Sequence, residues 1–239
     1  MGYTVIYGDT DSVFVSGIPN THDAQLLEDA INTSYDSYCA DLGIREHRLK
    51  IEFEAFSPRT IMVKKKRYAM KLDDGTYKVA GFQMKRSDTQ PFARTFQENV
   101  IHMILEGADK KSIREYYHQM KQEVLKGDHN ETIGIPSKVT KNLDEYADGF
   151  KIRGALYSNE HLNKNLGAGD KFIIYRINHI QPGTTPTDSI ALEYDEPIPE
   201  EYTVDTKVHW ERINKTVLPL LTDIGALEKT KQASLGDFL

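Results

Sequence analysis

The sequence predicts an α+β protein in which an antiparallel sheet covered by a helix precedes a mainly helical part and a flexible C-terminal tail. Three observations predict this class. Two segments, residues 3–15 and 60–82, have the alternating strands and turn residues of hairpins. Residues 92–104 and 110–126 carry the apolar stripe of helices. The 239 residues, 39% hydrophobic and 28% charged, are enough to bury a core.

The first predicted element is a hairpin whose turn carries two carboxylates. Residues 3–7 are rich in β-branched and aromatic side chains, Gly8 supplies a turn, and residues 12–15 resume as a strand. Side chains two apart in an extended segment, here Asp9 and Asp11, point to the same side. Both could therefore approach one Mg²⁺, which prefers oxygen ligands. A turn with two solvated acids is the alternative.

The elements expected next complete a first domain over residues 1–84. A helix follows the loop at 17–20 and ends near Leu42, with Gly43 as its stop signal. Residues 49–56 alternate apolar and charged side chains, which predicts a half-buried strand. Residues 60–72 and 77–82 form a hairpin around an Asp-Asp-Gly-Thr turn.

From Asp88 onward helical patterns prevail, which predicts a second domain over residues 85–228 and a tail over 229–239. Asp88 is expected to cap a helix that has Pro91 in its first turn and ends at Gly107. A second helix spans 110–126 and closes at Gly127. The remaining expectations are a loop at 128–142, helix at 150–166, strand at 171–177 and helix at 205–221.

Composition narrows the classes of function. The net charge of −6 argues against a nucleic-acid binder, but residues 64–86 hold eight basic residues against two acidic ones. Such a local basic face suits a phosphate backbone. The single cysteine, Cys39, excludes an intramolecular disulfide and fits a reducing compartment. No apolar run has the length of a membrane span and no signal-peptide pattern occurs, so we expect a cytoplasmic, nucleoid-associated protein without a membrane partner.

The string Tyr7-Gly8-Asp9-Thr10-Asp11-Ser12 between two apolar strands resembles the third polymerase motif of family B DNA polymerases. The resemblance implies that residues 1–84 are the C-terminal part of the palm and that residues 85–228 are the thumb. It also implies a catalytic role in which Asp11 ligates both Mg²⁺ ions of the active centre and Asp9 is a supporting carboxylate.

The same resemblance assigns DNA contacts to basic segments. Lys66-Arg67-Tyr68 resembles the family's KKRY element, in which Lys66 reaches the minor groove and Tyr68 packs beside the primer. A solvated, charged strand face is the alternative for this basic segment, ahead of a nuclear-localisation run. Residues 81–88, 135–138 and 151–155 resemble further segments that grip the duplex. The DNA-binding residues implied are Lys65, Lys66, Arg67, Tyr68, Lys85, Arg86, Lys138 and Arg153.

The resemblance also implies a missing partner. The 239 residues contain no DxxSLYPS-like or KxxxNSxYG-like string, and two-metal catalysis needs carboxylates that hold both ions. We therefore expect a DNA-directed DNA polymerase that is active only with a large subunit carrying the exonuclease, the fingers and the first palm aspartate. The chain resembles the small subunit of the split family B polymerase of methanogenic archaea. A truncated piece of a longer polymerase is the alternative.

The last residues resemble a docking motif for the sliding clamp (PCNA). Its glutamine and apolar positions are Gln232, Leu235, Phe238 and Leu239, although a second aromatic residue is usual in place of Leu239. A terminus that folds back on its own core is the simpler alternative. The expected partners are thus primer-template DNA, a deoxynucleoside triphosphate, the large subunit and the clamp. A non-catalytic, clamp-tethered DNA-binding module is the alternative function.

Overall fold

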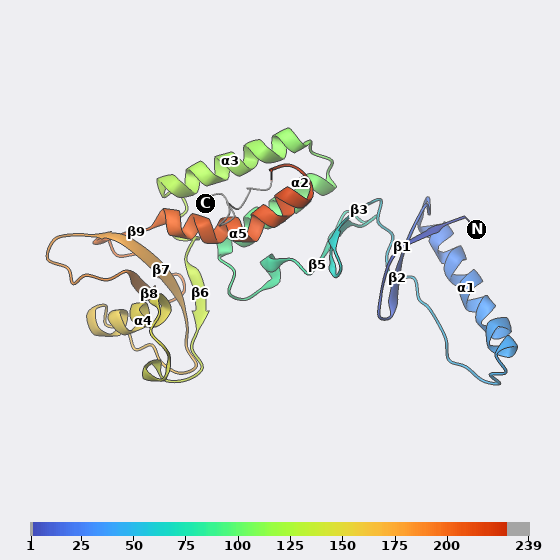
Figure 1. Ribbon diagram of the computed structural model, residues 1–239, viewed down its shortest axis with the longest axis horizontal. Helices are drawn as coiled ribbons and strands as arrows, with labels where there is room; N and C mark the ends of the chain where they lie inside the picture. Colours follow the sequence, from blue (N-terminus) through green and yellow to red (C-terminus); the bar gives the residue numbers. More distant parts are fainter. Residues whose placement is uncertain (1, 229–239) are drawn as a thin grey trace, which may run out of the picture. The chain divides into compact units, whose positions relative to one another are not determined.

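The computed structural model describes residues 2–228, and the chain divides into two compact units, Met1–Ala80 and Gly81–Leu239. Each unit contains both helices and antiparallel strands (Figure 1), which confirms the predicted α+β class. The units are described separately.

The first unit opens with the predicted hairpin. Strands β1 (Thr4–Asp9) and β2 (Ser12–Ser16) pair antiparallel, with Asp9 opposite Ser12. The register shifts between Val5 and Tyr7, a bulge that re-aims the side chains near the turn. Helix α1 (Thr21–Asp41) follows, and its N-cap Asn20 accepts the N–H of Asp23, which satisfies a helix-end donor.

The rest of the first unit is a three-stranded antiparallel sheet in the order β3-β4-β5. Its strands are β3 (Arg59–Lys64), β4 (Arg67–Lys71) and β5 (Tyr77–Ala80). The sequence prediction of one strand over residues 60–72 is wrong, because a turn at Lys65 and Lys66 divides it. The basic run therefore lies at a hairpin tip rather than along a strand.

The predicted strand at residues 49–56 is also wrong as an assignment of secondary structure. This segment pairs with no strand among residues 2–228. Its backbone is bonded by a side chain instead, because Asn32 donates to the carbonyl of Ile51 (3.0 Å) and accepts its N–H (2.9 Å). A strand needs a neighbouring strand for its ladder bonds, and the alternating pattern alone does not supply one.

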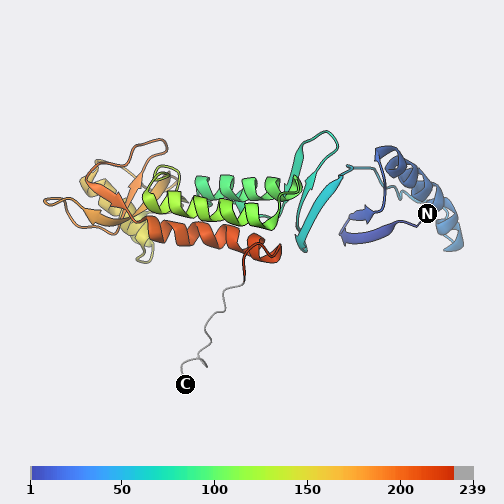
Figure 2. The same cartoon turned by 90° about the horizontal axis from the view of Figure 1, so that it is seen from above.

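Three helices of the second unit lie side by side (Figures 1 and 2): α2 (Pro91–Leu105), α3 (Lys110–Lys126) and α5 (Thr206–Asp223). The buried rings of Phe96, Tyr117 and Trp210 pack together between them. Helix α3 has the predicted bounds, with Asp109 as its N-cap and Gly127 in the left-handed region at its end (φ 93°). The expectation that Asp88 caps α2 is wrong, since Gln90 occupies that place and Asp88 pairs with Arg86.

The other half of the second unit is a sheet covered by a helix. Strand β7 (Lys171–Ile180) pairs with β6 (Ile135–Lys138), β8 (Ser189–Leu192) and β9 (Tyr202–Val204). Helix α4 (Phe150–His161) packs on β7 and β8 around buried Ile152, Phe172 and Ile174. Short 3₁₀ turns occupy Gln83–Lys85 (η1) and Leu143–Glu145 (η2).

Several predictions for this half need correction. Strand β6 lies within the expected loop at 128–142, and α4 ends at His161 rather than at residue 166. The sequence did not predict β8 or β9. A close approach fixes β6 against β7, since a Cβ on Gly134 would lie 2.2 Å from Cγ2 of Ile173. Among residues 2–228, no helix combines the length and apolarity needed to cross a bilayer.

Candidate catalytic turn and neighbouring basic residues

The turn between β1 and β2 holds the two candidate metal ligands. Asp9 ends β1, and residues Thr10 and Asp11 form the turn, with Thr10 in the left-handed region (φ 53°). The N–H of Asp11 donates to the carbonyl of Asp9 at 2.7 Å, and the hydroxyl of Ser12 donates to that carbonyl at 3.2 Å. Since Asp11 lies in the turn, the argument from alternating side chains on a strand does not apply to this pair.

The two carboxylates have different surroundings. The side chain of Asp9 is 26% exposed, accepts the hydroxyl of Thr10 at 3.3 Å, and lies 3.6 Å from Nζ of Lys66. Asp11 is exposed and lines a groove of about 1190 Å³. Both offer hard oxygen atoms, so they fit as two of the ligands of Mg²⁺. Residues 2–228 contain no cluster of three or more His, Cys, Asp or Glu side chains that could hold a metal.

The basic turn between β3 and β4 contacts the carboxylate turn. Lys66 has a left-handed backbone (φ 62°), and its N–H donates to the hydroxyl of Tyr7 at 2.9 Å. Aromatic rings continue the contact. Tyr7 and Phe14 lie 5.6 Å apart, and Phe14 meets Tyr68 edge-to-face at 5.0 Å. The first hairpin is thereby joined to the strand that carries the KKRY-like element.

The groove beside Asp11 is lined by both apolar and charged side chains. It lies between β2, α1 and the extended segment at 50–58, and its apolar lining includes Val13, Leu27, Ile51 and Phe53. Val5, Ile6 and Val13 on the hairpin are 64%, 51% and 50% exposed. So much apolar surface on one small hairpin is typical of a surface that another segment covers.

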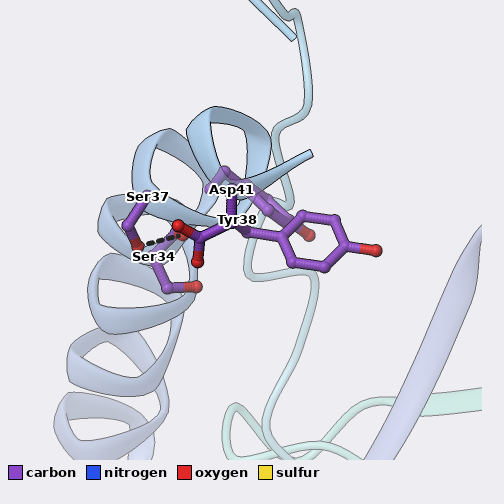
Figure 3. Close-up of a pocket in the computed structure, with 5 residues that line it drawn as sticks. Ser34, Ser37, Tyr38 and Asp41 are labelled. Carbon is purple, nitrogen blue, oxygen red and sulfur yellow. Dashed lines mark hydrogen bonds between the residues drawn. The ribbon is translucent and has the colours of Figure 1, made fainter. Parts of the chain in front are cut away.

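A smaller hollow of about 420 Å³ lies along α1 (Figure 3). It is lined by Ser34, Tyr35, Ser37, Tyr38 and Asp41. The hydroxyls of Ser34 and Ser37 donate to helix carbonyls, at 2.7 and 3.0 Å. These donors are therefore engaged within the helix, and the hollow offers no arrangement for catalysis.

Of the other predicted DNA contacts, two flank Lys66 and the rest lie elsewhere in the chain. Lys65 is exposed beside Lys66, and Arg67 begins β4. Arg86 makes a two-pronged contact with Asp88 (2.9 and 3.1 Å), which lowers the pKa of that carboxyl. Lys138 is exposed at the end of β6, opposite Lys171. The side chain of Lys85 and the tail residues lie outside the described part of the chain. The latter are Gln232, Leu235, Phe238 and Leu239.

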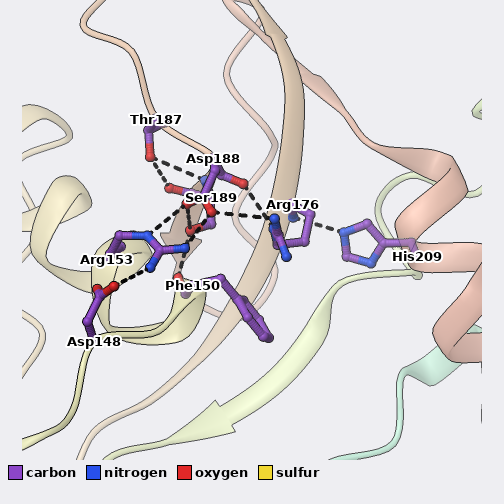
Figure 4. A network of polar contacts seen from close by, with 8 residues as sticks. All are labelled: Asp148, Phe150, Arg153, Arg176, Thr187, Asp188, Ser189 and His209. Carbon is purple, nitrogen blue, oxygen red and sulfur yellow. Dashed lines mark hydrogen bonds and ion pairs between the residues drawn. The ribbon is translucent and has the colours of Figure 1, made fainter.

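Arg153 is paired with two acids, although its side chain is 45% exposed (Figure 4). Its guanidinium donates to Asp148 and to Asp188, each at 2.7 Å. The hydrogen bond from Arg153 lowers the pKa of Asp188. Arg176 donates to the carbonyl of Asp188 at 3.1 Å, so this loop is held from two sides. Arg153 therefore braces α4 against the start of β8, a role that the sequence did not reveal.

Sequence reasoning missed Tyr7 and Phe14 as members of the candidate site. Both stand in runs that predict strands, and nothing in those runs indicates that the hydroxyl of Tyr7 meets a residue 59 positions later. Their position directly beside the carboxylate turn is the only available signal in the sequence.

Comparison with known proteins places this chain among polymerases. The DNA polymerase catalytic subunit of human herpesvirus 7 (strain JI) is 30% identical over 166 residues, which are 69% of this chain and 15% of the viral protein. The DNA polymerase of Thermococcus gorgonarius is 25% identical over 265 aligned residues, which cover 100% of this chain and 31% of that protein.

A solved structure gives the same fold. The family B DNA polymerase from the hyperthermophilic archaeon Pyrobaculum calidifontis matches with a TM-score of 0.64 at 24% identity, over 97% of this chain and 28% of that one. The chain thus spans less than a third of the length of these three relatives. Since the model of DNA polymerase family B matches residues 1–224, the chain belongs to that family.

Proposed function

We propose that this chain is the small catalytic subunit of a DNA-directed DNA polymerase. In the proposed reaction the 3′-hydroxyl of a primer attacks the α-phosphate of a deoxynucleoside triphosphate, and pyrophosphate leaves. The observation that carries the proposal is the hairpin turn bearing Asp9 and Asp11 in a member of DNA polymerase family B. The first unit would be the C-terminal part of the palm, and residues 85–228 would be the thumb.

Asp11 and Asp9 would hold Mg²⁺ at this turn. Mg²⁺ bound there supplies electrostatic stabilisation of the attacking and leaving oxygens. The protein's contribution is placement, because the N–H of Asp11 and the hydroxyl of Ser12 both donate to the carbonyl of Asp9 and so fix the short turn that carries both carboxylates. Asp11, exposed and facing the groove, is accessible to a ligand that approaches from outside the chain.

Primer-template DNA would be held by basic side chains and Tyr68. Lys65, Lys66 and Arg67 stand at or beside one hairpin tip, and Lys138 is exposed at a strand end. Arg86 and Arg153 are paired with acids, so each would offer a phosphate only the donors that those acids leave. Lys85 completes the proposed set.

The remaining metal ligand would come from a large subunit. With two carboxylates at the turn and no three-membered ligand cluster in residues 2–228, a third carboxylate from another polypeptide would complete the centre. The exposed apolar side chains of the first hairpin and the adjoining groove supply a surface that such a partner could cover.

Substitution of Asp11 tests the catalytic proposal. In the complex with the large subunit, Asp11→Ala should abolish primer extension, because removing a metal-binding carboxylate removes transition-state stabilisation. DNA affinity should stay nearly unchanged and should fall with rising salt in both proteins. Asp128→Ala, at an exposed turn after α3, is the matched control and should extend normally.

Three results would contradict the proposal. Unchanged extension in Asp11→Ala would remove this residue from the metal site. DNA binding without any extension by the wild-type complex would instead favour a non-catalytic, clamp-tethered accessory module. Extension by the isolated chain would contradict the shared active centre.

The tail would dock on the sliding clamp through Gln232, Leu235, Phe238 and Leu239. Support for this comes from the sequence pattern alone. Deleting residues 232–239 should reduce clamp-stimulated synthesis and spare basal synthesis, because an ordered tail contributes affinity only when the clamp is present. Equal loss of both activities in primer-extension assays would count against docking.

A further inference from the structure

We propose that Tyr7 is a positioning residue that holds the basic turn at Lys66 against the carboxylate turn at Asp9. The effect on catalysis that we infer for Tyr7 rests on the proposed polymerase function. The structural part of the inference, which is the contact between two hairpin tips of the first unit, rests on the contacts of Tyr7, Lys66 and Asp9.

The hydroxyl of Tyr7 makes a polar contact with a residue 59 positions later in the sequence. It accepts the backbone N–H of Lys66 at 2.9 Å, between the end of β1 and the turn that joins β3 to β4. That N–H lies in a turn rather than in a strand ladder. The phenol therefore gives the turn an acceptor from another hairpin.

The backbone at Lys66 makes this contact consequential. Its φ of 62° lies in the left-handed region, which residues other than glycine seldom adopt. A turn in such a conformation needs surrounding contacts to keep it there. The hydrogen bond to Tyr7 is a contact of that kind, since it is made by the backbone of the strained residue itself.

The backbone conformation of Lys66 also determines where its side-chain ammonium group lies. Nζ of Lys66 lies 3.6 Å from Oδ1 of Asp9, and the two side chains are 66% and 26% exposed. An ion pair this exposed contributes little by itself and is screened by salt. The position of the ammonium group therefore depends on the backbone that carries it, and Tyr7 fixes that backbone.

The ring and the hydroxyl of Tyr7 have separable tasks. The ring packs 5.6 Å from that of Phe14, which in turn meets Tyr68. Phenylalanine would preserve this packing and would lose only the acceptor for Lys66. Tyr7→Phe is therefore a variant that should fold and that tests the hydroxyl alone.

Amide hydrogen exchange in the full chain tests the structural part. In Tyr7→Phe the Lys66 amide should exchange roughly tenfold faster, since one net hydrogen bond changes an equilibrium by about that factor. Amides of α1, which lies in the same unit as Tyr7, should be unaffected, which would show that this unit of the variant is folded. Tyr38→Phe, on an exposed tyrosine of α1, should leave Lys66 protected as in the wild type. Unchanged protection in Tyr7→Phe would overturn the proposal.

A double-mutant cycle in the complete polymerase tests the positioning role. Tyr7→Phe and Lys66→Ala should each slow primer extension roughly five- to tenfold at saturating nucleotide, as expected for one lost contact. If Tyr7 acts through the lysine ammonium, the double variant should be no slower than Lys66→Ala. Losses that multiply would overturn the role. Failure of the Asp11→Ala test would remove the polymerase function while leaving the exchange result standing.

Discussion

At the scale of single residues, His209 shows how burial sets a chemical state. Its side chain is fully buried on α5, and its Nε2 accepts the N–H of Arg176 at 2.9 Å (Figure 4). Because Nε2 is an acceptor, the proton of the neutral ring belongs on Nδ1, which lies 3.2 Å from the amide nitrogen of Gln90 and beside the backbone of Ile133. Burial lowers the pKa of His209 to about 4, and the hydrogen bond to Ile133 opposes that shift.

This histidine predicts a loss of stability in acid. The folded pKa of about 4 lies below the unfolded value near 6.5, so the unfolded chain binds the proton more tightly. The stabilisation is complete above pH 6.5 and is lost as the pH falls toward 4, a change of about 3 kcal/mol in the free energy of unfolding. Urea titrations at several pH values measure it.

A substitution isolates the contribution of His209. His209→Asn should be less stable at neutral pH and should show a flatter dependence of stability between pH 6.5 and 4. His179→Asn, on an exposed histidine of β7, should keep the wild-type slope. Equal slopes in wild type and His209→Asn would contradict the argument.

The sequence alone did not reveal which basic side chains are paired with acidic ones. The sequence marks Arg86 and Arg153 as candidates for phosphate contacts, yet Arg86 is bonded to Asp88 and Arg153 to two aspartates. One of those acids, Asp188, lies 35 residues from Arg153 along the chain. Local charge counts can identify a basic segment, but they cannot say where its charges are neutralised.

At the scale of elements, local chemistry made helices predictable. Helix α3 has the predicted bounds because both ends carry their own signals, a side-chain cap at Asp109 and a left-handed glycine at 127. Helix α2 was misjudged at its start, since Asp88 had a competing partner in Arg86. Helix ends are thus predictable where no charged neighbour competes for the cap.

Strands were harder, because each depends on a distant neighbour. Residues 49–56 have the period of a half-buried strand, but no strand in residues 2–228 pairs with them. Strand β6 was missed because its four residues carry no clear strand pattern of their own and form a strand only by pairing with β7. The candidate site also has a part that the sequence predicts and a part that it does not. Asp9 and Asp11 are readable from the sequence, whereas the contact of Tyr7 with Lys66 depends on tertiary structure.

At the scale of the whole molecule, the first unit has an unusually small buried core. Its buried hydrophobic residues are Ala24, Cys39, Ala69 and Met70. The second unit, by contrast, buries the aromatic group around Phe96 and the cluster around Phe172. A two-stranded hairpin is marginally stable alone and needs a covering surface. Relatives are more than three times as long, so they contain further segments that could provide one.

We therefore predict that the exposed face of the first hairpin binds the proposed large subunit. Ile6→Asp with Val13→Asp should weaken association at least tenfold, because burying one such side chain contributes about 1.5–3 kcal/mol and a buried carboxylate opposes binding. Titrating the large subunit into a primer-extension assay measures the effect. Leu156→Asp, on a 47% exposed leucine of α4, is the matched control and should bind normally. Equal weakening by all these substitutions, or none by the hairpin pair, would place the interface elsewhere.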